Sequence, residues 1–119
     1  MSELATAIAK LEAVKAHNPN RDATKHHLVQ REMNQDRIQF AQLIGDIARN
    51  WEQDAKLNAN PALKSEFGSR FAETRHTLSR HQAAWTADRM AAEPKEYQAS
   101  VMNTGKTLSE FLAWAKHAI

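Results

Sequence analysis

Four stretches of the chain repeat apolar residues at steps of three and four, and turn-forming residues separate them. Each of the three breaks contains one of the chain's prolines (Pro19, Pro61 and Pro94), beside residues that favour turns or helix caps. Steps of three and four place side chains on one face of an α-helix. The pattern therefore predicts four helices, over about 2–17, 21–57, 61–92 and 94–119.

Each predicted helix carries one apolar stripe, which we assign to a common core. Trp51 and Trp85 fall on the stripes of their helices, so we interpret both as core residues. The other main stripe positions are Leu4, Leu11, Phe40, Ile44, Ile47, Phe67, Phe71, Leu78, Val101, Leu108 and Leu112.

Helices joined by short connections pack beside their sequence neighbours and run in alternating directions. The sequence therefore predicts an all-α fold, an antiparallel up-down four-helix bundle with one short and three longer helices. Residues 1–119 are expected to form a single domain. A continuous helix over 21–57 would be about 55 Å long at ~1.5 Å per residue, so a break near residues 34–36 is the alternative.

Composition and charge exclude several classes of site. The chain has no cysteine, which rules out disulfides and thiolate metal sites and fits a cytoplasmic location. No stretch approaches the roughly 20 apolar residues that span a bilayer, and the first residues do not form a signal peptide. The net charge is +2, with both signs interspersed, so neither a membrane surface nor a nucleic acid is signalled as a partner.

Glu73 and His76 have the Glu-x-x-His spacing used in di-iron helical bundles. Those sites need the same motif on a second helix and further glutamates on the other two, all pointing inward. This chain offers one such motif, and at about 100° per residue His76 lies opposite the apolar stripe. We therefore expect no metal and no other cofactor.

The sequence from Arg75 to Arg80 resembles the His-Thr-Leu-Lys-Gly signature of histidine phosphotransfer domains. His76, Thr77 and Leu78 match it, whereas Ser79 and Arg80 stand where the family has lysine and glycine. The resemblance implies a four-helix bundle that carries a phosphoryl group on an exposed His76. Phosphorelay is therefore one alternative function.

A second alternative comes from Arg75 and His81, whose separation is similar to the Arg-x(4–6)-His motif of the HEPN helical nucleases. This resemblance implies cleavage of RNA by a composite Arg–His site. The two side chains are about 120° apart around one helix, so such a site would need a distorted helix.

Four charged residues fall near the predicted inward faces. A buried ionised side chain is costly unless it is paired. We therefore expect an Asp–Arg pair between the second and third segments, drawn from Asp36, Arg37, Asp54 and Arg70.

Several large apolar residues lie off the stripes, and they are the best positive indication of function. Apolar residues gathered on a surface mark protein contacts, and tryptophan is common among interface anchors. The leading hypothesis is therefore a non-enzymatic helical interaction module, an adaptor, a chaperone-like binder or a homodimer. It would bind a protein partner or itself and no small molecule, through the candidate interface residues Leu28, Ile38, Met90 and Trp114.

Overall fold

The computed structural model describes residues 2–15 and 26–119, without the side chains of 14–15, 26–34 and 36. All regular secondary structure in these residues is helical, which confirms the predicted all-α class. The molecule measures 50 × 20 × 19 Å along its principal axes. The elements are α1 (Glu3–Lys15), α2 (His26–Asn50), the 3-10 helix η1 (Trp51–Gln53), α3 (Ala55–Asn58), α4 (Pro61–Ala84), α5 (Ala87–Ala92) and α6 (Pro94–Ala118).

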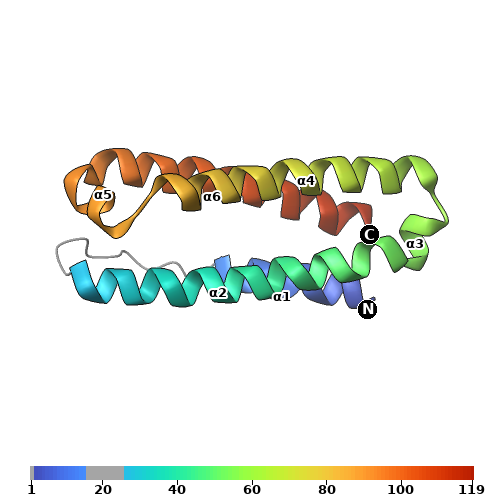
Figure 1. Ribbon diagram of the computed structural model, residues 1–119. Coiled ribbons are helices and arrows are strands. Elements are labelled where there is room, and N and C mark those ends of the chain that lie inside the picture. Colours follow the sequence, from blue (N-terminus) through green and yellow to red (C-terminus); the bar gives the residue numbers. More distant parts are fainter. Residues whose placement is uncertain (1, 16–25) are drawn as a thin grey trace.

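The four longer helices lie in two layers, α1 with α2 and α4 with α6 (Figure 1). Within each layer the two helices pack closely, and α1 also packs on α6 across the layers. Each of these helices runs opposite to the preceding one, so both termini lie at one end of the molecule and α5 lies at the other (Figure 1).

The second predicted segment contains one long helix, which ends earlier than expected. The helix continues through 34–36, so the predicted break there is wrong. It ends instead at Asn50, and a turn of 3-10 helix leads to the short α3. Asp54 starts α3 by accepting a hydrogen bond from the Leu57 N–H at 3.1 Å. This N-cap folds the end of the segment back, so the helix stays within the length of its neighbours.

The third predicted segment is two helices rather than one. The backbone of Trp85 is extended, with φ −111° and ψ 100°, and Trp85 closes α4. Thr86 then caps α5, because its hydroxyl accepts a hydrogen bond from the Arg89 N–H at 3.1 Å. The continuous helix predicted over 61–92 is therefore wrong, and the residues after Thr86 point in directions that the α4 stripe does not predict.

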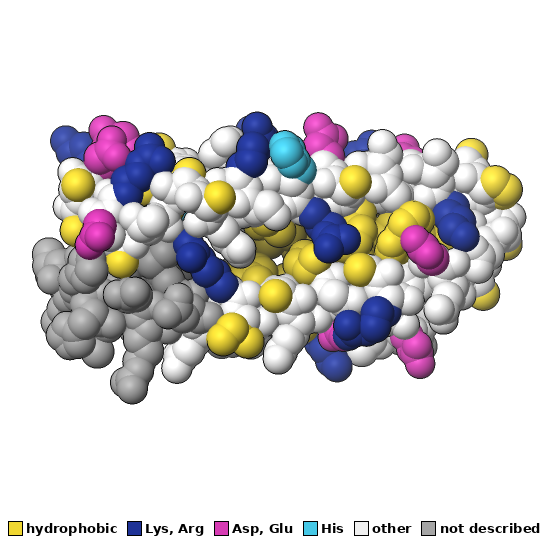
Figure 2. Space-filling view, viewed as in Figure 1, with side chains coloured by type: hydrophobic (Ala, Val, Ile, Leu, Met, Phe, Trp, Pro, Cys, Tyr) yellow, Lys and Arg dark blue, Asp and Glu magenta, His cyan; other side chains and the backbone are white. Residues whose placement is uncertain are grey.

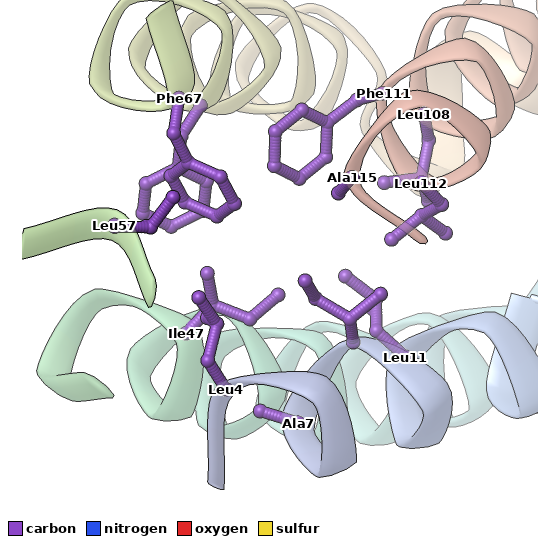
Figure 3. Close-up of a cluster of buried hydrophobic side chains, with 12 residues drawn as sticks. Leu4, Ala7, Leu11, Ile47, Leu57, Phe67, Leu108, Phe111, Leu112 and Ala115 are labelled. Atoms are coloured by element: carbon purple, nitrogen blue, oxygen red, sulfur yellow. The ribbon is translucent and has the colours of Figure 1, made fainter. Parts of the chain in front are cut away.

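The main core lies where α1, α2, α4 and α6 meet, toward the end that carries the termini. Figure 3 shows side chains from the two layers pointing toward one another. Phe67 is fully buried and its ring lies 5.5 Å from that of Phe111 and 5.8 Å from that of Trp51 (ring centroids). The main core consists of Leu4, Ala7, Ile8, Leu11, Ile47, Leu57, Phe67, Phe71, Leu108, Phe111, Leu112 and Ala115.

A second and smaller apolar cluster lies at the α5 end. Trp85 is 5% exposed and Met90 is 1% exposed, and Tyr97 of α6 packs against them. The Tyr97 ring meets Trp85 edge-on at 5.5 Å. The sequence-based assignment of Trp85 to the core is confirmed.

Candidate interaction groove

The face between α2 and α4 is open. Among the described residues, α1 and α2, α4 and α6, and α1 and α6 pack closely, whereas α2 and α4 meet at few points along their length. Figure 2 shows this face hollowed between the two layers, with hydrophobic side chains visible at the bottom of the hollow. We call this hollow the α2–α4 groove. Its walls are Arg37, Ala41, Ile44 and Ala48 of α2 and Lys64, Gly68, Arg75 and Gln82 of α4.

The α2 wall is formed by Arg37, Ala41, Ile44 and Ala48, which share one side of the helix at steps of four, three and four. Ala41 is exposed, and Ile44 and Ala48 are only partly buried although both pack on the main core. Small side chains on this wall leave room for a second backbone to approach. The α2 wall is therefore apolar over most of its length and incompletely covered.

The α4 wall carries Lys64, Gly68, Arg75 and Gln82 on one side of the helix, with Leu78 partly buried beneath them. At one end of the groove the Trp51 ring lies against Gly68, where an added Cβ would come within 2.9 Å of the ring. Glycine at this position therefore lets the indole pack directly on the α4 backbone.

At the other end of the groove, Arg37 joins α2 to the end of α4. Its Nη2 donates hydrogen bonds to the carbonyl oxygens of Gln82 at 2.9 Å and of Trp85 at 2.8 Å. Carbonyl groups in the last turn of a helix have no partner within the helix, and a cation there also faces the negative end of the helix dipole. The groove is thus closed at both ends and open between them.

The walls that α2 and α4 form carry the cations Arg37, Lys64 and Arg75, and Glu52 of η1 lies beside Lys64 at the Trp51 end. The Arg75 guanidinium lies 5.4 Å from the centre of the Phe71 ring. Acidic side chains of the same helices point elsewhere. Asp46 faces α1 across a shallow hollow that it shares with Glu3, and Glu66 faces Arg70 on the α6 side of α4. The groove is therefore apolar with a positive edge.

His81 lies beside the Arg37 end of the groove, on the α6 side of α4. Its Nδ1 is 2.7 Å from the Ser100 hydroxyl, and its ring stacks on Tyr97 with 6.0 Å between centroids. Burial, and to a lesser degree the positive charge of Arg37, lower the pKa of His81 below its usual 6.5. The imidazole is therefore mainly neutral at pH 7 and helps to hold α4 against α6.

The three candidate interface residues whose side chains are described, Ile38, Met90 and Trp114, do not form one patch. Ile38 is 61% exposed and lies at the outer edge of the α2 wall, whereas Trp114 is half-buried against Phe67 and the Arg70 guanidinium. The prediction that Met90 is exposed is wrong, because the break at 85–86 turns it into the small cluster. The side chain of Leu28 lies outside the described residues.

The candidate catalytic residues are also separated. His76 is exposed, and it lies on the solvent side of α4. Arg75 contacts Phe71 at the groove, whereas His81 contacts Ser100 of α6, so their contacts lie on different sides of α4. Among the residues that the structure describes, no three His, Asp or Glu side chains converge as a metal site would require.

The predicted Asp–Arg pair between the second and third segments is not formed among Arg37, Asp54 and Arg70, the three of its four candidate residues whose side chains are described. Arg37 binds backbone carbonyls, Asp54 caps α3, and Arg70 stands 4.6 Å from the centre of the Trp114 ring. The side chain of Asp36 is outside the described part of the chain. Arg37 points inward for a different reason, since its guanidinium donates hydrogen bonds to the last carbonyl groups of α4.

Within the described ranges, no helix is both long and apolar enough to cross a bilayer. Compared with protein-family models, curated proteins and solved structures, the chain has no match. The sequence patterns did not reveal the groove, and the signal available for it was the repeat of Ala41, Ile44 and Ala48 beside the core stripe.

Proposed function

We propose that this chain is a non-enzymatic helical interaction module that binds a helix of a protein partner in the α2–α4 groove. The observation that carries the proposal is the open face between α2 and α4, where core-contacting side chains such as Ile44 and Leu78 remain partly exposed. Covering apolar surface is the main favourable term in protein association. A helix laid in an apolar groove is a common way to do so.

The scaffold that we propose for this function is an antiparallel up-down four-helix bundle with one side left open. Two observations support it. The four longer helices alternate in direction, and α1 packs closely on α2, α4 on α6, and α1 on α6. The open side runs from Arg37 to Trp51, which is about 21 Å at ~1.5 Å per residue. A helix of about four turns would fill that length.

The test uses a 16-residue amphipathic peptide of Leu and Ala with neutral Gln on its polar flanks, titrated against the full chain by calorimetry. Ala48→Trp would place an indole in the groove, about one helical turn from its Trp51 end, so we expect it to weaken binding at least about tenfold. Ala99→Trp, on an exposed position of α6, is the matched control and should bind like the wild type. Equal binding by both variants would contradict the proposal.

The exposed position of His76 supports a second candidate function, transfer of a phosphoryl group from a receiver domain. The reaction would move the phosphoryl group from an aspartyl phosphate to an imidazole nitrogen of His76 and regenerate the aspartate. Incubation with a phosphorylated receiver domain should then label the wild type and leave His76→Ala unlabelled. Equal labelling of the two proteins would end this alternative.

A further inference from the structure

We infer that the helix bound in the α2–α4 groove is acidic along its flanks, an amphipathic segment with Asp or Glu beside its apolar stripe. This inference rests on the proposed function and adds the chemistry of the partner. It comes from the distribution of charge along the groove walls.

The described walls of the groove hold three cations, Arg37, Lys64 and Arg75, and the described carboxylate beside them is that of Glu52 in η1, whose carbonyl oxygen accepts a hydrogen bond from Lys64 at the Trp51 end. The excess of positive charge therefore lies at Arg75 and toward the Arg37 end. Opposite-charge complementarity across an interface favours the correct partner, and like charges brought together oppose the wrong one. A helix with basic flanks would bring like charges together along both walls.

Arg75 is the cation best placed to select a partner. Lys64 at one end donates to the Asn58 side chain and the Glu52 carbonyl, and Arg37 at the other end holds the carbonyls of α4. Arg75 is exposed, and its guanidinium lies over the Phe71 ring, between these two ends. Such a stacked guanidinium keeps its hydrogen-bond donors available for a carboxylate.

A second copy of this chain is a poorer occupant of the groove. The large hydrophobic residues that stand strongly exposed in the described structure are Ile38 on α2 and Met102 on α6. Among the side chains that the structure describes, neither helix repeats such residues at steps of three and four on its outer face. The described part of a copy therefore offers no exposed apolar stripe that would fill the groove.

The test adds two peptides to the neutral one, identical in their Leu and Ala positions but with Glu or Lys on the flanks. At low salt, where charge attraction is least screened, we expect the Glu peptide to bind the full chain at least about fivefold tighter than the Lys peptide. Arg75→Glu should reduce that ratio by about fivefold or more. Lys106→Glu, the same change on an exposed site of α6, should leave the ratio near its wild-type value.

Each other outcome has a clear meaning. If the Lys peptide binds as well as the Glu peptide while the neutral peptide still binds, the acidic partner is ruled out and the proposed function stands. If none of the three peptides binds, the proposed function fails and the inference fails with it. If the chain is a dimer that Ala48→Trp dissociates, the occupant is a second copy and the inference is overturned.

Discussion

The helices are held together by different contacts at the two ends of the molecule. One end carries both termini, and the other carries α5. At the terminal end, all four longer helices meet around buried aromatic rings such as Phe67 and Phe111. The α5 end has a smaller apolar cluster, and hydrogen bonds from side chains such as Arg37 and His81 join its helices. Among the described residues, the 13-residue α1 contributes side chains to the main core, whereas the cluster at the α5 end consists of Trp85, Met90 and Tyr97.

This comparison shows how a bundle with one short helix can remain ordered beyond the reach of that helix. Where α1 covers its neighbours, burial of apolar surface supplies the stability. At the α5 end, cations satisfy the last carbonyls of α4, since Arg89 also donates to the Ala84 oxygen at 2.9 Å and lies over the Trp85 ring. The polar contacts are directional, so they fix geometry where there is less surface to bury.

The largest expected effect is at the terminal end. Phe67→Ala should lower the free energy of unfolding by about 3–5 kcal/mol, because it removes a fully buried ring that contacts four other aromatic rings. Met90→Ala should cost less, about 2 kcal/mol, because its cluster is small. Urea unfolding of both variants measures the difference. Equal losses would mean that the two ends contribute alike.

Arg37→Met tests the polar connection at the α5 end. It should lower the free energy of unfolding by about 1–3 kcal/mol, because two carbonyls at the end of α4 lose their donor. Arg49→Met is the matched control, since Arg49 is exposed and pairs with Asp46 on the surface, and it should cost about 0–1 kcal/mol. Amide hydrogen exchange should accelerate near 82–90 in Arg37→Met and remain slow in the main core. If amide exchange accelerates equally in the main core and near 82–90, the two ends are not stabilised independently.

The smallest expected effect is a pH dependence carried by His81. Burial lowers its folded-state pKa below 6.5, so below that pH the unfolded chain binds more protons than the folded one. The contribution of the neutral imidazole is therefore complete above about pH 6.5 and decreases as the pH falls toward the folded-state pKa. His81→Gln removes the titrating group, and its stability should fall less than that of the wild type between pH 6.5 and 5. Superimposable pH profiles would contradict this.

Stripes of apolar residues predicted many of the side chains that meet in the main core, although they missed Leu57. Leu11, Ile47 and Leu112 were placed inward by their spacing and are buried in the structure. The spacing could not locate the break after Trp85, because neither proline nor glycine marks it. Thr86, a residue type that favours N-caps, was the available signal, and missing it put Met90 on the wrong surface.

The apolar stripes alone could not locate the groove, for a physical reason. An apolar stripe shows that a helix buries one face. The distance between two helices, however, depends on contacts between residues that are far apart in the sequence. Here Trp51 against Gly68 and Arg37 at the last carbonyls of α4 set the contacts at the two ends of the groove. None of these pairings follows from a local pattern. The sequence predicted an Asp–Arg pair between the second and third segments, and it did not predict that Arg37 would bind the carbonyl oxygens at the end of α4.

The common location of the two chain ends gives a practical way to observe this fold. In Figure 1 both ends emerge from the same end of the molecule, and Glu12 of α1 and Lys116 of α6 form an ion pair at 3.1 Å. A donor dye near one terminus and an acceptor near the other would transfer energy efficiently in the folded chain and poorly when it opens. Both dyes would stand away from the Arg37 end of the groove, so one labelled protein could report unfolding without obstructing that end.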